Sequence, residues 1–264
     1  MSEMTPSIGG WKTRPVYTRV AIAGLLLIAL TLFVFSIPSV IHGDLVTLGV
    51  WVFIMVVSLI FAGLIWRFEN WTLALATLWG LLELLLGGGL LGISLRFPNS
   101  FFDFVIPVLL TVGGLLTAVG AMVAFVQLRR GTLRSVTTRG ERRAFRAIAI
   151  ITAALVILSG SLHIAGLTIV STEDKAGAIL VELNNDYLVP NRLEIPGGET
   201  TRIVVENNDF FAHTFEIEEL GIKQTILPFS ELLIELRPTN TGDFTILSEA
   251  PMTGDMEGTL VVTE

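Results

Sequence analysis

Residues 147–183 read AIAIITAALVILSGSLHIAGLTIVSTEDKAGAILVEL, and the character of the chain changes within this stretch. Its first part, residues 147–170, contains no Asp, Glu, Lys or Arg. It is long enough for a membrane-spanning helix, which needs about 20 apolar residues. After a polar linker at residues 171–177 come short runs rich in Val, Ile and Leu, which are typical of strands. The stretch therefore predicts a junction between a membrane helix and a β-domain.

Four more apolar segments precede this junction, at residues 20–41, 45–66, 71–95 and 101–128. The whole chain of 264 residues is 52% hydrophobic with a mean hydropathy of +0.72. Only helices and closed barrels satisfy their backbone groups in lipid, and these runs are too long for barrel strands. We predict a five-helix transmembrane domain at residues 20–170, after an N-terminal tail at residues 1–19.

The basic residues predict the orientation of these helices. The loop before the fifth helix is rich in arginine, and the N-terminal tail is basic too: Lys12, Arg14, Arg19, Arg129, Arg130, Arg134, Arg139, Arg142, Arg143 and Arg146. Because Lys and Arg are enriched in cytoplasmic loops, both regions are expected on the cytoplasmic side of the cell membrane. Five crossings then put residues 178–264 outside. We interpret the arginines as a topological signal and a contact for anionic membrane lipids, in preference to nucleic-acid binding.

Charge and cysteine content narrow the function classes. Residues 171–264 contain 5 Lys/Arg against 18 Asp/Glu, a net charge of −13, while the rest of the chain has 12 against 6. An acidic external domain favours a basic extracytoplasmic partner by electrostatic steering. The chain has no cysteine, which excludes disulfides, iron–sulfur clusters and thiolate metal sites. No motif of a hydrolase or nucleotide-binding enzyme is present, so we expect no catalysis.

The last third of the chain alternates short strand-like runs with turn signals. Strands are expected at residues 178–183, 200–206, 213–217, 232–236, 243–247 and 258–262, and Gly, Asn and Asp punctuate the segments between them. Strands of this length and spacing suggest an antiparallel sandwich.

Residues 178–263 resemble the cupredoxin family. The motifs are YLVP at 187–190, LEIPGG at 193–198, IVVEN at 203–207 and AHTF at 212–215, followed by GDF at 242–244 and GDMEG at 254–258. The resemblance implies an all-β Greek-key sandwich in which His213 matches the first copper-ligand histidine and Met256 the axial methionine.

The copper site departs from the family pattern. Counting back from Met256 puts Ser248 at the cysteine position, and Pro251 or Met252 near the second histidine. A blue-copper centre depends on its thiolate, so none is expected. His213 and Met256, with Met252 on the same loop, would make a thioether-rich Cu(I) site. The alternative is that His213 survives as a hydrogen-bonded residue at the rim of the domain and both methionines fill a loop core.

The helical segments offer a few polar and small residues. Glu83 lies near the middle of the third segment, either hydrogen-bonded between helices or lining a proton or ion path. His42 and His163, both expected near the outer face, could hold a haem, though nothing in their flanks supports this. Glycines in the third and fourth segments would allow close helix packing: Gly87, Gly88, Gly89, Gly92, Gly113 and Gly114.

Three hypotheses follow from the sequence. The first is a non-catalytic binding or accessory subunit of a membrane complex, which the resemblance implies to be one of electron transfer, with a degenerate copper site. The second is a Cu(I)-handling or electron-transfer protein that uses His213 and Met256. The third is a proton- or ion-coupled function through Glu83.

Overall fold

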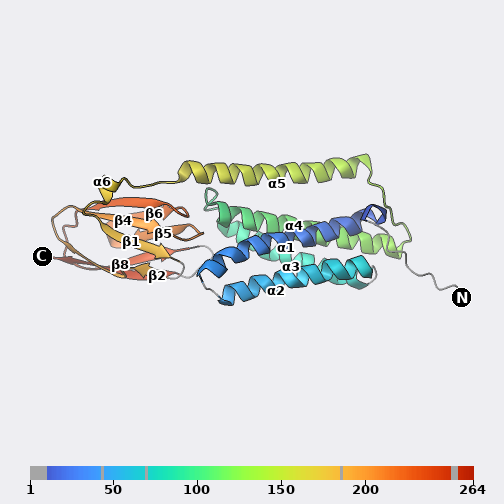
Figure 1. The fold of residues 1–264 in the computed structure, drawn as a ribbon, viewed down its shortest axis with the longest axis horizontal. Helices are drawn as coiled ribbons and strands as arrows, with labels where there is room; N and C mark the ends of the chain where they lie inside the picture. The colour runs from blue at the N-terminus through green and yellow to red at the C-terminus, as the bar shows by residue number, and fades with distance from the viewer. Residues whose placement is uncertain (1–10, 43–44, 69–70, 185–186, 251–254) are drawn as a thin grey trace. The chain divides into compact units, whose positions relative to one another are not determined.

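The computed structural model describes residues 11–42, 45–68, 71–184, 187–250 and 255–264 (Figure 1). The chain divides into two compact units. The helical unit comprises Met1–Gly92 and Ile106–Leu155, and the sandwich unit comprises Ile93–Val105 and Val156–Glu264. The start of α4 (Phe101–Arg129) and the C-terminal part of α5 (Arg139–Gly166) thus belong to the sandwich unit.

Within the described residues, five helices are long and apolar enough to cross a membrane. They are α1 (Val16–His42), α2 (Leu45–Arg67), α3 (Trp71–Ser94), α4 (Phe101–Arg129) and α5 (Arg139–Gly166), preceded by the short helix η1 (Trp11–Thr13). All five predicted helices are therefore present.

In the helical unit, α4 packs closely against both α1 and α3 through glycines. A Cβ atom on Gly113 would lie 2.7 Å from the Ile28 side chain of α1, and one on Gly114 would lie 2.5 Å from the Leu84 backbone nitrogen of α3. Gly87 of α3 has the same role, because a Cβ there would lie 2.7 Å from the Thr111 nitrogen. The predicted close packing does not extend to Gly88, Gly89 and Gly92, which face open space.

The fifth helix begins earlier than the apolar segment alone predicts. Thr138 and Glu141 form a capping box: the Glu141 N–H donates to the Thr138 hydroxyl at 3.2 Å, and the Glu141 carboxylate accepts from the Thr138 N–H at 2.7 Å. This cap starts α5 at Arg139, within the arginine-rich segment. Little of the apolar stretch of α5 is buried inside the structure, as expected of a helix that faces lipid.

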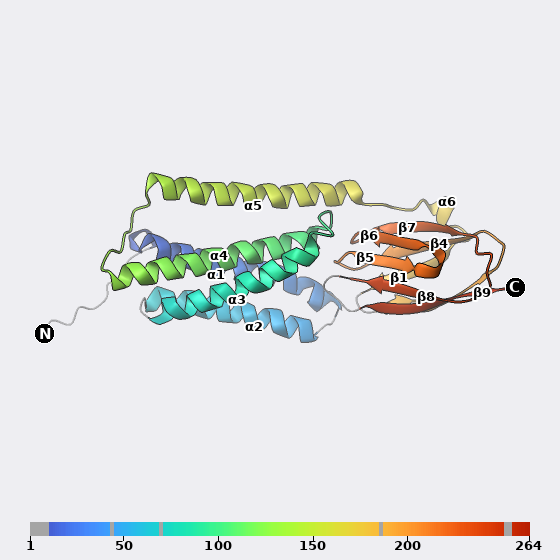
Figure 2. The same cartoon turned by 180° about the vertical axis from the view of Figure 1, so that it is seen from behind.

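The sandwich unit contains nine described strands in two sheets (Figure 2). One sheet has the order β2-β1-β4-β7 and the other β3-β9-β8-β5-β6. The strands are β1 (Ile179–Asn184), β2 (Tyr187–Val189), β3 (Arg192–Pro196), β4 (Thr201–Asn207), β5 (His213–Ile217), β6 (Ile222–Ile226), β7 (Glu231–Leu236), β8 (Gly242–Glu249) and β9 (Met256–Thr263). Two short helices, α6 (Thr172–Lys175) and η2 (Glu218–Leu220), complete the unit.

The sandwich is not purely antiparallel, which corrects the prediction. β1 pairs in parallel with β4, and β3 pairs in parallel with β9. β2, β3 and β6 also lie outside the predicted strand set, because each is short and lies close to turn residues. The core forms where the inner faces of the two sheets meet, and Phe215 is its largest fully buried side chain.

Candidate functional site

Asn207, the last residue of β4, organises the loop that leads to β5. Its side-chain amide nitrogen lies 2.8 Å from the Phe211 carbonyl, 3.0 Å from that of Ile226 and 3.1 Å from that of Leu227. Its side-chain oxygen accepts from the Asp209 N–H at 2.9 Å. One buried side chain thus fixes the 208–212 loop against the end of β6, and this positions Asp209 and His213.

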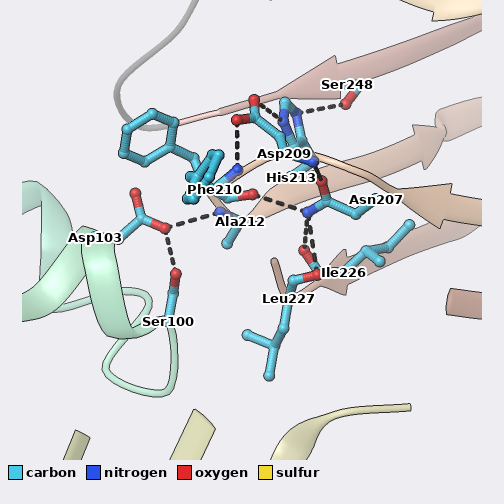
Figure 3. A network of polar contacts seen from close by, with 11 residues as sticks. Ser100, Asp103, Asn207, Asp209, Phe210, Ala212, His213, Ile226, Leu227 and Ser248 are labelled. Carbon is cyan, nitrogen blue, oxygen red and sulfur yellow. Dashed lines mark hydrogen bonds and ion pairs between the residues drawn. The ribbon is translucent and has the colours of Figure 1, made fainter. Parts of the chain in front are cut away.

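Asp209, His213 and Ser248 form a buried chain of polar contacts (Figure 3). The Nε2 of His213 lies 3.0 Å from Oδ2 of Asp209, and its Nδ1 lies 3.4 Å from the Ser248 hydroxyl. All three side chains are fully buried. Because a carboxylate only accepts, Nε2 carries the proton, and in the neutral ring Nδ1 then accepts from Ser248. Both ring nitrogens of His213 therefore have protein partners.

Asp103, in the first turn of α4, reaches the same loop. Its Oδ2 accepts from the Ala212 N–H at 2.8 Å and from the Ser100 hydroxyl (Figure 3). The side chain is fully buried, and its Oδ1 has no partner among the described residues. The sequence predicts only a helix-end role for Asp103. The structure adds a direct link between α4 and the residue that precedes His213.

The other predicted metal ligands are only partly brought together. Met256, the first residue of β9, pairs with Ser248 across the sheet and is buried in the sandwich core. Met252 and Pro251 lie outside the described residues. Ser248 thus lies between His213, which it contacts, and Met256.

The described side chains do not fit a copper centre. They supply one imidazole whose two nitrogens have protein partners, and one core thioether, with no thiolate. In the described parts of the chain, no group of three or more His, Cys, Asp and Glu residues could hold a metal ion. Copper sites in proteins draw on several soft or imidazole ligands at once.

Glu83 is buried in the helical unit, and its Oε2 has no partner within the part of the chain that the structure describes. Its backbone lies against Gly114 of α4. Of the other histidines, His163 lies with Nδ1 3.3 Å from the Asn99 carbonyl oxygen. His42 ends α1, and its side chain lies outside what the structure describes.

The linker is held to the edge strand β7. The Glu231 N–H donates to the Thr168 carbonyl at 2.9 Å, and its carboxylate accepts from the Val170 N–H at 2.8 Å. Lys175 makes ion pairs of 2.7 Å with Glu206 and 2.8 Å with Glu231. Burial alone would raise the pKa of Glu231, but Lys175 and the Val170 N–H outweigh it and lower that pKa. Hydrogen bonds to Glu206 and Glu231 raise the pKa of Lys175.

Sequence reasoning missed Asp209 and the contact between Ser248 and His213. Asp209 reads as one of three turn-forming residues, Asn207, Asn208 and Asp209, and its spacing of four from His213 lies across a loop, where no helical periodicity signals contact. Ser248 is identified only as the replacement of a missing ligand. The structure makes it a partner of His213.

Three solved structures that are similar to the C-terminal part of the chain are distant from it in sequence. The metal-binding domain of the Cu(I)-exporting P-type ATPase CopA of Streptococcus pneumoniae is 17% identical, with 37% of this chain and 93% of that chain covered and a TM-score of 0.28. The periplasmic domain of cytochrome oxidase subunit II of Bradyrhizobium japonicum is 16% identical, with 33% and 84% covered and a TM-score of 0.28. Auracyanin of Roseiflexus castenholzii is 12% identical, with 33% and 98% covered and a TM-score of 0.27.

No curated protein sequence matches the chain. Residues 147–262 match the family model described as a cupredoxin-like domain, and this range includes the two-sheet sandwich except for the last residue of β9. The chain therefore carries a C-terminal cupredoxin-like domain together with five helices that are long and apolar enough to span a membrane.

Proposed function

We propose that this protein is a non-catalytic accessory or binding subunit of a membrane complex, anchored by five transmembrane helices, with its cupredoxin-like domain outside the cytoplasm. The observation that carries the proposal is the buried Asp209–His213–Ser248 chain. Hydrogen bonds to protein groups occupy the imidazole, so the domain keeps its fold without an electron-transferring metal.

The orientation rests on the arginine-rich segment. Arg139, Arg142, Arg143 and Arg146 line one exposed pocket of about 350 Å³, and their spacing puts them on one face of α5. Arginines at one end of a helix that faces lipid favour the cytoplasmic surface, where anionic headgroups attract them by about 1 kcal/mol each. The other end of α5, and with it the domain, then lies outside.

The partner that we propose is a basic extracytoplasmic protein or a basic surface of a neighbouring subunit. Residues 171–264 have a net charge of −13, from 5 Lys/Arg and 18 Asp/Glu. Exposed acids of the domain include Glu218, Glu219, Glu249 and Glu257. A field of one sign raises the rate of encounter with a partner of the opposite sign, and the effect weakens with salt.

The decisive experiment loads the full chain, purified in detergent, with Cu(I) under reducing conditions and separately with Cu(II). We expect less than one bound copper per chain and no intense visible absorption. Stoichiometric binding that is lost in both His213→Ala and Met256→Ala would overturn the proposal in favour of the Cu(I)-handling hypothesis. Glu257→Ala, an exposed acid next to Met256, is the matched control and should leave any binding unchanged.

Membership of a complex is tested on native membranes. The full chain should comigrate with a larger assembly after mild solubilisation. High salt should release it from that assembly, and so should acidic-to-neutral substitutions at the four exposed glutamates. Migration at the mass of the isolated chain in all detergents would contradict the accessory role. A Glu83→Gln variant that remains fully active in its native membrane would argue against the proton-coupled alternative.

A further inference from the structure

The turn between β6 and β7 holds an aromatic residue in a strained conformation. The Ser230 N–H donates to the Leu227 carbonyl at 3.1 Å, which closes a four-residue turn with Pro228 and Phe229 in the middle. Phe229 has a φ of 57° and is the only described non-glycine residue with positive φ. Proline followed by positive φ is the pattern of a type II turn, which favours glycine or asparagine at the position that Phe229 occupies. A bulky residue in this region destabilises the folded chain.

This strained side chain is also half exposed. Phe229 has 51% of its surface open, although its ring contacts Phe210 edge-to-face at a centroid distance of 5.0 Å. Replacement by glycine would relieve the strain, although it would also remove the buried half of the ring. The exposed half makes no contribution to packing, which leaves it available for a role at the surface.

The turn lies at the level where two of the apolar helices end. Phe210 contacts Phe102 edge-to-face at 5.5 Å, and Phe102 contacts Phe101 at 5.4 Å, so the aromatic rings run without a gap from the first residues of α4 to Phe229. At the end of α5, a Cβ on Gly166 would lie 2.8 Å from the Leu227 side chain. All the residues in these contacts belong to the sandwich unit.

We propose that Phe229 inserts into the headgroup region of the outer membrane leaflet and, with Phe101, Phe102 and Phe210, holds the sandwich at the lipid surface. This inference rests on the proposed transmembrane location of α4 and α5. The first residues of a spanning helix lie in the interfacial layer by construction, since the hydrocarbon core is about 30 Å thick and the interfaces add about 10–15 Å in all. Aromatic side chains partition favourably into that layer. The row of ring contacts from Phe101 to Phe229 places the β6–β7 turn at the same layer.

The absence of cysteine from the chain allows a direct test. Phe229→Cys, labelled with an environment-sensitive fluorophore in the full chain, is reconstituted in phosphatidylcholine–phosphatidylglycerol vesicles that contain headgroup-level nitroxide lipids. Asn240→Cys is the matched control, because it lies beyond the other end of β7 and is also exposed. Leu115→Cys, exposed in the middle of α4, reports whether the helix is in lipid at all.

We expect the nitroxide lipids to quench the label at residue 229 at least threefold more than the label at residue 240. If residue 115 is in lipid but residues 229 and 240 are equally unquenched and open to aqueous iodide, the inference fails and the proposed membrane location stands. If residue 115 is also open to iodide, the membrane location itself fails. Shielding of residue 229 from both lipid and iodide would indicate a protein partner and would equally overturn the inference. Phe229→Trp repeats the quenching test without a label, in case the label disturbs the turn. The quenching due to residue 229 is the difference in tryptophan fluorescence between this variant and the parent chain.

Discussion

The imidazole of His213 donates from Nε2 to the carboxylate of Asp209 at 3.0 Å, with both side chains fully buried. In a metal site, a carboxylate on one ring nitrogen orients the other toward the metal. Here the other nitrogen faces Ser248. The geometry that would orient a ligand therefore closes a hydrogen-bonded chain within the protein.

Asp209→Ala should destabilise the sandwich unit. The change removes the acceptor of the part-buried Phe210 N–H and that of the buried His213 Nε2–H, and an unsatisfied buried donor costs about 1–3 kcal/mol. Asp209→Asn keeps one acceptor oxygen and should show a smaller loss. Amide hydrogen exchange of β5 and β8 in the full chain measures both. Equal protection in the wild type and Asp209→Ala would mean that the Asp209–His213–Ser248 contacts contribute nothing to stability.

Asn207→Asp should be more damaging than its size suggests. The amide nitrogen that lies against the carbonyls of Phe211, Ile226 and Leu227 becomes a carboxylate oxygen, so donors are replaced by a buried charge. Such an uncompensated charge costs about 3–5 kcal/mol. We expect lost exchange protection at the ends of β4 and β6, together with poor recovery of folded protein. The exposed neighbour change Asn208→Asp is the control and should be nearly neutral.

Glu231 predicts an acid limb in the stability of the domain. A pKa lowered below its usual value of 4.5 means that the Glu231 contacts stabilise the fold above that pH, and the contribution is lost as pH falls below it. Glu231→Gln should flatten the fall of the thermal midpoint as the pH drops below 4.5, with the midpoint followed by the amide I signal of the sheets. Glu235→Gln, an exposed acid on the same strand, should leave the acid limb as it is.

Gly87→Ala and Gly88→Ala should differ although the residues are neighbours. A Cβ at residue 87 would meet the Thr111 backbone at 2.7 Å, whereas one at residue 88 meets nothing within 4 Å. Overpacking costs about 1–3 kcal/mol, so Gly87→Ala should lower the thermal midpoint of the detergent-solubilised chain by several degrees. Gly88→Ala should be neutral or slightly stabilising through helix propensity. Equal midpoints would contradict the close packing of α3 on α4.

Ser248→Cys should give the domain a copper signal that we do not expect of the wild type. Its sulfur would take the place of a hydroxyl that lies 3.4 Å from Nδ1 of His213, on a strand position paired with Met256. We expect copper-dependent visible absorption in the full chain loaded with Cu(II), and its loss in the Ser248→Cys/His213→Ala double variant. A Ser248→Cys chain that stays colourless and binds no copper would show that His213 is not available to a metal.

Much of the fold follows from local sequence. The apolar segments predict the five helices because each must satisfy its own backbone in lipid, and the cupredoxin motifs predict the sandwich. The early start of α5 escapes hydropathy because a capping box, Thr138 with Glu141, begins it in charged sequence. Strands β2, β3 and β6 escape because short runs beside turn residues carry a weak period-2 signal.

The candidate site follows only in part. The spacing from Met256 identifies Ser248, and the AHTF motif identifies His213, but neither reveals Asp209 or Asp103 as partners. Asp209 approaches His213 through a loop that Asn207 shapes by binding three distant carbonyls. Asp103 lies 109 positions before Ala212, so no local pattern connects them.

The sequence by itself determined the two kinds of structure in this chain, because hydrophobic length and strand periodicity are local properties, and it excluded a thiolate metal centre because cysteine is absent. Tertiary structure decided which small residues meet, that β1 pairs in parallel with β4 and β3 with β9, and that His213 is engaged by Asp209 and Ser248. Apart from Asp209 and His213, which meet across a loop, these relationships join residues far apart in the chain, and only the folded backbone brings their atoms into contact.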